Sequence, residues 1–247
     1  MNVFITGASS GIGAALAAEF ARRGATLGLV ARRADALEKL RASLPGRHHI
    51  YAVDVTDRDA IVAAGKAFDA ESGGADIVIA NAGISIGVKT EYFEDLAQFE
   101  RVFDTNVLAM AQTFHPFIAP MKARRRGTLV GIASVAGVRG LPGSEAYCAS
   151  KAAATVYCES LRVELAKSQV RVVTISPGFI RTEMTAANPY KMPFLLAVDK
   201  FAARAADAIE AGVRSRTRPW QMGGVTTLLK WLPRWLFDRL LASAAST

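Results

Sequence analysis

Short apolar segments alternate with amphipathic ones along most of this chain, and that alternation constrains the fold more than any other feature. The first apolar segment, NVFIT, is followed by GIGAALAAEFARRG, whose apolar residues recur with the spacing of a helix. The same order repeats as far as the segment VRVVTISPG. Strand-length apolar segments between helices indicate a parallel sheet whose two faces are both covered by helices.

The expected elements form one α/β domain. We predict strands at residues 2–6, 25–31, 48–55, 75–83, 126–134 and 170–178, and helices at 11–24, 34–44, 57–72, about 95–122 and 145–167. Right-handed connections would wind these strands into a doubly wound, Rossmann-type parallel sheet. Beyond Thr182 we expect a helix near 199–212, a last strand at RPWQMG (218–223) and an apolar tail over 224–247. No linker or repeat divides residues 1–247, so we expect a single domain.

Composition sets several classes of function aside. Hydrophobic residues make up 51% of the 247 residues and charged residues 21%, which suits a packed core rather than a disordered chain. The formal net charge of +8 fits a nucleic acid, an anionic membrane or an anionic cofactor. Because the basic residues are scattered and no basic run is interleaved with aromatic residues, we expect no nucleic-acid partner and favour a phosphate-bearing ligand.

The cysteines indicate neither a disulfide nor a metal site. Cys148 and Cys158 lie ten residues apart in one predicted helix, about 15 Å along its axis, which is too far for a disulfide. With no metal-ligand cluster in the sequence, we expect two reduced thiols, no metal and a cytoplasmic protein. The predicted strand at Asn2 leaves no room for a signal peptide, and no apolar run reaches the about 20 residues of a membrane span.

The segment TGASSGIG, from Thr6 to Gly13, joins the first strand to the first helix. Gly7 would allow a tight turn, Gly11 the close approach of a pyrophosphate, and Gly13 the packing of the helix on the sheet. The helix would offer free N–H groups and its positive dipole end to the phosphates. A glycine turn alone is weak evidence, but its position in the first strand–helix unit predicts dinucleotide binding. The residues expected to form this site are Gly7, Ser9, Ser10, Gly11, Ile12 and Gly13.

Two arginines follow the second strand, at the point where dinucleotide-binding folds select their cofactor. An acidic residue there would bind the ribose 2′-hydroxyl, whereas an arginine accommodates a 2′-phosphate. This chain has Ala31 followed by Arg32 and Arg33. We expect Ser9 of the glycine turn to lie near the same phosphate. We therefore predict NADP(H) over NAD(H). The alternative, two solvated arginines opening a helix, is disfavoured because cations at a helix N-terminus are mildly unfavourable.

The segment YCASK sets Tyr147 and Lys151 one helical turn apart on the same face. A free tyrosine has a pKa of about 10, too high for efficient acid–base catalysis at neutral pH, and a nearby ammonium would lower it. Such a tyrosine can give a proton to a carbonyl oxygen as hydride arrives at the carbon. Taken alone, the pair is better explained as an aromatic and a cation sharing a helix face, because this spacing is common in ordinary helices; the second tyrosine, Tyr157, has no such lysine. Ser134 favours the chemistry, because it ends a predicted strand at the same edge of the sheet.

Together these motifs resemble one family. TGxxxGxG, the segment NAG, a later asparagine, a serine thirteen residues before a tyrosine, YxxxK and a PG pair follow in this order in the short-chain dehydrogenase/reductases. The resemblance covers roughly residues 2–185 and is specific as a combination, although each motif is weak. The spacing of tyrosine and lysine is similar to that of members that interconvert carbonyls and alcohols rather than reduce C=C bonds.

The resemblance implies roles for individual residues. Tyr147 would be the general acid/base, Lys151 would lower its pKa and hold the nicotinamide ribose, and Ser134 would position the carbonyl. Asn106 would hold a water in a proton relay behind Lys151. The remaining cofactor contacts would be Asp54 and Val55 at the adenine, Asn81, Ala82 and Gly83 on the adenosine side, and Pro177, Gly178, Ile180 and Thr182 around the nicotinamide and its phosphate.

Some of these residues have simpler interpretations when taken singly. For Asn106 and Asp54 the alternative is a role as helix caps. Pro177 and Gly178 are also an ordinary turn.

The resemblance also implies a substrate lid over residues 182–215 and assembly into a homodimer or homotetramer through the helices that carry Asn106 and Tyr147. The lid contains the apolar residues Met184, Met192, Phe194, Leu195 and Leu196, which suggest a pocket wall for a small hydrophobic carbonyl or alcohol; core packing is the alternative. The expected activity is NADP(H)-dependent carbonyl reduction or alcohol oxidation. The alternative is a non-catalytic scaffold or regulator that binds a dinucleotide.

The C-terminal tail over 224–247 mixes aromatic and basic residues. Pro233 interrupts it. We expect the tail to pack on its own domain or on a second subunit, with peripheral contact to a membrane surface as a second option.

Overall fold

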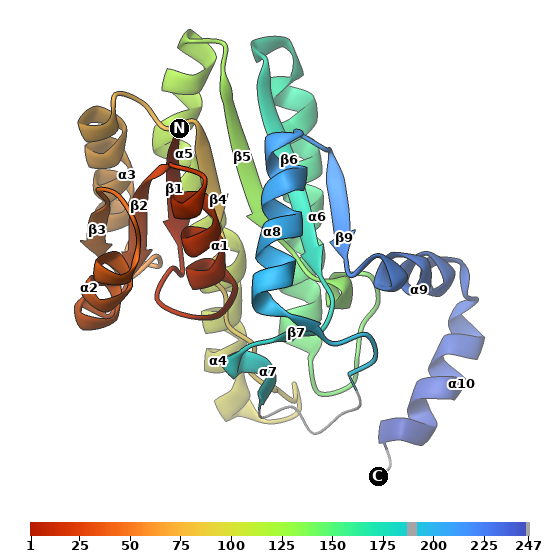
Figure 1. The fold of residues 1–247 in the computed structure, drawn as a ribbon. Helices are drawn as coiled ribbons and strands as arrows, with labels where there is room; N and C mark the ends of the chain where they lie inside the picture. The colour runs from red at the N-terminus through yellow and green to blue at the C-terminus, as the bar shows by residue number, and fades with distance from the viewer. Residues whose placement is uncertain (187–191, 246–247) are drawn as a thin grey trace.

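The computed structural model describes residues 1–186 and 192–245, with side chains described as far as Ala242. Its main element is a seven-stranded parallel sheet with the order β3-β2-β1-β4-β5-β6-β9 (Figure 1). The strands are β1 (Asn2–Thr6), β2 (Thr26–Ala31), β3 (His49–Ala52), β4 (Ile77–Ala80), β5 (Gly127–Ile132), β6 (Val170–Pro177) and β9 (Ser215–Arg218). This topology confirms the predicted doubly wound, Rossmann-type α/β fold.

The central strands are apolar because both faces of the sheet are covered. Every residue of β4 and of β5 is buried. A strand that is buried on both faces loses the alternation of polar and apolar residues seen in half-exposed strands. The segments IVIA and GTLVGI therefore read as continuous apolar runs, which is why the sequence located them.

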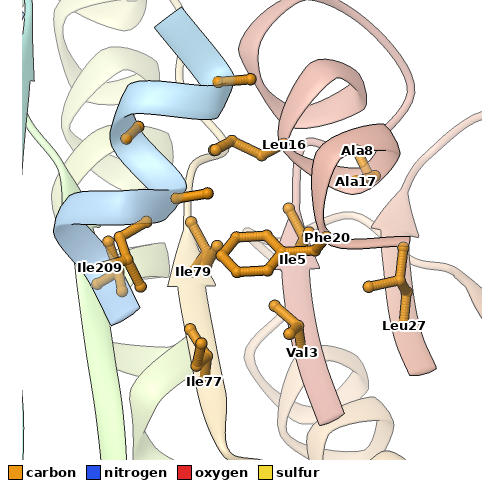
Figure 2. Packing of buried hydrophobic residues seen from close by; sticks show 14 of the residues in the cluster. Val3, Ile5, Ala8, Leu16, Ala17, Phe20, Leu27, Ile77, Ile79 and Ile209 are labelled. Carbon is orange, nitrogen blue, oxygen red and sulfur yellow. The ribbon is translucent and has the colours of Figure 1, made fainter. Parts of the chain in front are cut away.

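Helices pack on the two faces of the sheet and divide the core in two. On one face lie α1 (Gly11–Arg22), α2 (Ala34–Ser43) and α8 (Val198–Glu210), and on the other α3 (Arg58–Ser72), α5 (Ala109–Ala123) and α6 (Glu145–Leu165). Figure 2 shows Leu16 and Phe20 of α1 and Ile209 of α8 over the strand residues Ile5 and Ile79. On the second face the rings of Phe68 and Phe117 pack against Phe4, with centroids 5.5 and 5.1 Å away.

The long helical region predicted near residues 95–122 is interrupted by a π-helical turn. It consists of α4 (Phe93–Phe103), the turn η1 (Asp104–Leu108) and α5, and the backbone remains helical throughout. Asn106 lies inside this turn, so it is not the helix cap that one interpretation of the sequence suggested. Single π-helical turns occur mostly within α-helices and often at functional sites.

The last predicted strand is wrong in its position. The strand β9 ends at Arg218, and residues from Trp220 onward form the helix α9 (Trp220–Trp231), so the segment 218–223 is helical over most of its length. Pro219 stands between the two elements and has no N–H to donate to a sheet, which ends the strand there. The tail continues as a second helix, α10 (Arg234–Ala245).

The segment assigned to a substrate lid divides into several short elements and one core helix. It contains α7 (Glu183–Ala186) and the strand β8 (Leu196–Ala197), which pairs with β7 (Ile180–Arg181). The helix α8 packs on the sheet through buried residues such as Phe201, so this part of the segment belongs to the core. In the described part of the chain no helix has the length and hydropathy needed to cross a membrane.

Candidate active site

A cavity of about 490 Å³ opens at the carboxyl edge of the sheet. The strands β1 and β4 are neighbours there, although β2 and β3 follow β1 in the chain and lie on its other side. This reversal of strand order leaves a crevice in which doubly wound folds bind their ligands. The predicted residues that line the cavity are Gly7, Ser9, Ser10, Gly11, Ile12, Arg32, Arg33, Asp54, Val55, Asn81, Ala82, Gly83, Ser134, Tyr147, Lys151, Pro177, Gly178, Ile180 and Thr182.

Two predicted residues, Gly13 and Asn106, lie behind the wall of the cavity. Gly13 is buried in the first turn of α1, where a Cβ atom would overlap the carbonyl oxygen of Gly7. Gly7 itself has φ +65°, in the left-handed region that favours glycine. The glycine turn therefore keeps α1 close to the end of β1, which brings the start of the helix to the cavity.

The N-terminus of α1 presents to the cavity backbone N–H groups that have no hydrogen-bond partner among the described residues. Ser10 is the N-cap residue, and its side chain makes no capping hydrogen bond. The first helical residues, Gly11 and Ile12, line the cavity directly. Free N–H groups and the positive end of the helix dipole make such a terminus suited to a phosphate.

Asn81 links the ends of β1 and β4. Its Nδ2 donates to the carbonyl oxygen of Thr6 at 2.9 Å, and its backbone N–H donates to the Thr6 hydroxyl at 3.1 Å. These bonds fix the NAG segment beside the glycine turn. Asn81 thus holds together the two strand ends that form the crevice, and it also lines the cavity.

Arg32 and Arg33 lie on the cavity wall where β2 ends. The Arg32 side chain is 65% exposed and its Nη1 is 3.9 Å from the carboxylate Oδ2 of Asp54, a distance at which the ion pair leaves the guanidinium available to a ligand. Burial would raise the pKa of Asp54, but hydrogen bonds from Thr56 and the charges of Arg32 and Arg101 lower it below its ordinary value. The cap of α3 is Asp57, whose Oδ1 accepts from Ala60 N at 3.0 Å, so Asp54 is not the helix cap.

Ser134, Tyr147 and Lys151 line the cavity together and come from two parts of the chain. Ser134 follows β5 and starts the short helix η2 (Val135–Gly137), while Tyr147 and Lys151 lie on α6. The ammonium Nζ of Lys151 lies 5.9 Å from the centre of the Tyr147 ring and donates to the carbonyl oxygen of Ile132 at 2.9 Å. Lys151 is only 4% exposed, so its charge is directed into the cavity rather than into bulk water.

Burial controls the pKa values of this group. Desolvation raises the pKa of Tyr147, hydrogen bonding to Ser134 opposes that rise, and Cys148 adds to it. Desolvation also lowers the pKa of Lys151, to about 8. The sequence predicted a lowered pKa for Tyr147, and the structure differs because removal from water disfavours the phenolate. At neutral pH the phenol is therefore protonated, the form that donates a proton.

Asn106 supports the site from the π-helical turn. Its Oδ1 accepts from the backbone N–H of Ile84 at 2.8 Å, and its Nδ2 donates to the carbonyl of Ile84 at 3.0 Å and to the hydroxyl of Ser150 at 2.9 Å. The backbone of Gly83 lies between Asn106 and Lys151, because a Cβ there would meet Asn106 Oδ1 at 3.1 Å and Lys151 Nζ at 3.3 Å. Asn106 thereby holds the end of β4 against α6.

Gly178 connects the cavity to the C-terminal helices. Its N–H donates to the carbonyl of Arg218 at 2.7 Å, and a Cβ at this position would lie 2.8 Å from Cγ of Met222 in α9. Pro177 is the last residue of β6, so the pair is not the ordinary turn of the alternative interpretation, and Gly178 packs beneath α9.

Several lining residues were not predicted from the sequence. They are Ala31, Val53, Thr56, Ile84, Arg101, Thr105, Ile132, Ala133, Glu183 and Thr185. Some of these directly adjoin predicted residues and follow from the strand ends. Arg101 and Thr105 come from α4 and the π-helical turn, and no sequence motif marks them.

The predicted apolar wall is only partly present among the described residues. Met184 lines the cavity. Met192 is half-buried, Phe194 and Leu195 are 51% and 36% exposed, and none of the three is on the cavity wall. Leu196 packs on the core.

Comparison with known proteins places this arrangement in a family. The family model described as short chain dehydrogenase matches residues 1–192. An uncharacterized oxidoreductase from Myxococcus xanthus is 40% identical over 240 residues, which is 96% of this chain and 94% of that protein.

Two solved structures illustrate the range of cofactors among similar folds. L-sorbose reductase from Gluconobacter frateurii, crystallised with NADPH and L-sorbose, has a TM-score of 0.78 and 27% identity, covering 87% of this chain and 94% of the other. A 3-ketoacyl-(acyl-carrier-protein) reductase from Brucella melitensis, crystallised with NADH, has a TM-score of 0.80 and 25% identity, covering 88% and 96%.

Proposed function

The chain belongs to the short-chain dehydrogenase family of oxidoreductases, and from that premise we propose that it interconverts a carbonyl and an alcohol on a hydrophobic small molecule with NADP(H) as cofactor. One observation carries this proposal: Ser134, Tyr147 and Lys151 line the same cavity as the glycine turn. A proton donor and a nucleotide-binding turn in one cavity suit hydride transfer coupled to proton transfer.

In this proposal the residues of α6 and the β5 edge carry the proton chemistry. Bound NADPH would supply the hydride. The hydroxyl of Ser134 donates to the substrate carbonyl oxygen and orients it, and Tyr147 gives that oxygen its proton as the new C–H bond forms. The ammonium of Lys151 stabilises the phenolate left on Tyr147. In the reverse direction the same phenolate takes the proton from the alcohol.

We assign NADP(H) on the basis of charge at the end of β2. Similar folds take NADPH or NADH, so the residues of this chain must decide. Arg32 and Arg33 line the cavity there, and an arginine at this point of the fold meets a 2′-phosphate. The negative charge of Asp54 is already compensated by the positive charges of Arg32 and Arg101. The site therefore remains suited to an anion.

Replacing Arg32 with aspartate tests this assignment. We expect the affinity for NADPH to fall about 10- to 100-fold, since one charge-assisted hydrogen-bond partner of a phosphate is lost and a repulsive charge is gained. NADH affinity should change little. Fluorescence titration of both cofactors measures the two effects. The control is Arg47→Asp, because Arg47 precedes β3 and so lies at the amino ends of the strands, whereas the cavity lies at their carboxyl ends. Equal losses for NADPH and NADH would contradict the assignment.

The rate of carbonyl reduction should stay level below about pH 8 and fall above it. Tyr147 must carry its proton to donate, and its raised pKa keeps it protonated in this window. The pKa of Lys151, about 8, is crossed first as the pH rises, and the loss of its charge removes the stabilisation of the phenolate. A pH profile of kcat/KM with NADPH and a hydrophobic aldehyde measures this. A rate that rises through the same window would contradict the proton-donor role of Tyr147.

We also propose that the protein assembles as a homodimer or homotetramer through the helices that carry Asn106 and Tyr147. Large apolar side chains on their outer surfaces support this, since Leu108 of η1 is 53% exposed and Val156 and Val163 of α6 are 61% and 71% exposed. Sedimentation of the purified chain gives the mass of the assembly, and a monomer at micromolar concentration would contradict the proposal.

A further inference from the structure

The helix α9 exposes three large apolar side chains. Trp220 is 70% exposed, Leu228 70% and Trp231 83%, and their spacing along the helix puts them on one side. The residues that face the protein are Met222 and Thr226, each buried. A surface helix of a globular protein normally shows the reverse pattern. The outer face of α9 is therefore suited to contact with something less polar than water.

The helix α10 continues this surface and is fixed to the domain. Trp235 at its start is 67% exposed. From the loop after η2, the guanidinium of Arg139 lies 4.4 Å above the ring of Phe237, and its Nη2 donates to the carbonyl of Leu232 at 2.9 Å. The exposed tryptophans are thus held in position by contacts on the inner side of the two helices.

The charge of this region is strongly positive. From Arg214 to the C-terminus the chain has six lysines and arginines and one carboxylate, Asp238, so this part contributes a net +5 to the +8 of the whole. Lys230, Arg234 and Arg239 are exposed on the two helices beside the tryptophans. Within the described part of the chain these three cations form no ion pair.

We propose that α9 and α10 dock on the surface of an anionic membrane. Tryptophan is suited to the membrane–water interface, where its ring lies among the head groups, and flanking lysines and arginines are attracted to anionic lipids. The surface is positive and apolar at once, which complements a negatively charged lipid head-group layer. A second copy of the chain fits it less well, because a symmetric contact would bring the same cations together.

The position of the two helices on the domain indicates which part of the protein would face the membrane. Figure 1 shows α10 descending toward the end of the domain at which α7 lies, the carboxyl edge of the sheet. The close approach of Met222 to Gly178 places the start of α9 next to a residue that lines the cavity. Docking would therefore hold the cavity beside the lipid surface, an orientation that suits a hydrophobic substrate and, in that respect, rests on the proposed function.

Tryptophan fluorescence offers a direct test, because all three tryptophans of the chain lie in this surface. The intact protein is mixed with vesicles of phosphatidylcholine containing phosphatidylserine, or with vesicles of phosphatidylcholine alone. We expect the emission to shift to shorter wavelength with the anionic vesicles only, and the protein to sediment with them. Added salt should weaken both effects, since the attraction to the lipid charges is screened.

Two variants separate the apolar and the charged contributions. Trp231→Ala with Trp235→Ala should lower the vesicle affinity at least about tenfold, because two interfacial side chains are lost. Lys230→Glu with Arg234→Glu should lower it as much or more. The matched control is Lys39→Glu with Lys66→Glu, which changes the total charge equally on α2 and α3, at the far edge of the sheet. Circular dichroism and NADPH binding check that each variant is folded, and they do not depend on the membrane.

The outcomes divide cleanly. Binding to anionic vesicles that both tail variants reduce and the control retains supports the proposal, whether or not the protein reduces any carbonyl tested. No binding to anionic vesicles by the folded wild-type chain overturns it. Binding that both tail variants retain also overturns it. So does a change of oligomeric mass in the tail variants without any vesicle binding, which would show that a second copy covers the surface.

Discussion

Replacing Tyr147 with phenylalanine is expected to lower kcat for NADPH-dependent carbonyl reduction about a thousandfold, while NADPH binds nearly as before. The substitution removes the only atom that delivers the proton in the proposed mechanism and keeps the ring in place. A positioned acid or base contributes about 10²- to 10⁴-fold to a rate. Steady-state kinetics with a hydrophobic aldehyde and fluorescence titration of NADPH measure the two quantities separately.

Tyr157 provides the matched control for this experiment. It lies on the same helix α6, its ring is stacked with that of Phe114, and it is not on the wall of the cavity. Tyr157→Phe should leave kcat within about twofold, as expected for a substitution outside the site. If Tyr147→Phe retained full activity, the proton would come from elsewhere. If neither the wild type nor any variant turned over while NADPH still bound, a dinucleotide-binding regulator would be the better description.

Replacing Gly13 with alanine is expected to lower the free energy of unfolding by about 3 kcal/mol or more and to abolish most NADPH binding. The new Cβ would overlap the carbonyl oxygen of Gly7 and lie 2.6 Å from Nδ2 of Asn81, so either the glycine turn or the start of α1 must move. In an ordinary helix the same change stabilises by about 1 kcal/mol, because alanine loses less backbone entropy. The sign of the effect therefore tests the close contact.

Gly140 offers a control without such a contact. A Cβ built on Gly140 meets no atom within 4 Å, and the residue is exposed. Gly140→Ala should change the free energy of unfolding by less than about 0.5 kcal/mol. Urea denaturation of the three proteins compares the effects. A Gly13→Ala variant as stable as the wild type would mean that the turn adapts at little cost.

The sequence predicted the fold because its local patterns agree with the tertiary structure. The strands β4 and β5 are buried on both faces, so their apolar runs are unbroken. The glycine turn and the NAG segment each follow a strand, the YxxxK pair lies in the first turns of α6, and the topology brings all three to the same edge of the sheet. Periodicity and strand order were sufficient for this part of the site.

Other features depend on contacts between distant segments, which no local pattern encodes. Arg101 of α4 lines the cavity, and its charge lowers the pKa of Asp54. The raised pKa of Tyr147 reflects burial by the whole domain, whereas the sequence revealed only the nearby lysine. The strand predicted at 218–223 was wrong because tryptophan and glutamine suit either element, and Pro219 decides between them.

The π-helical turn around Asn106 sets the rotational phase of two helices. Each residue of an α-helix advances its side chains by about 100° around the axis. The wide turn at Asp104–Leu108 therefore offsets α4 from α5, so that Arg101 and Thr105 face the cavity while Asn106 faces the core and the residues of α5 pack on the sheet. Deleting one residue of the turn would rotate α4 about its own axis relative to α5. Its cavity-facing side chains would then point away from the crevice. The number of residues in this turn thus determines the orientation of α4 about its axis. The site depends on that number as much as on the identity of any side chain.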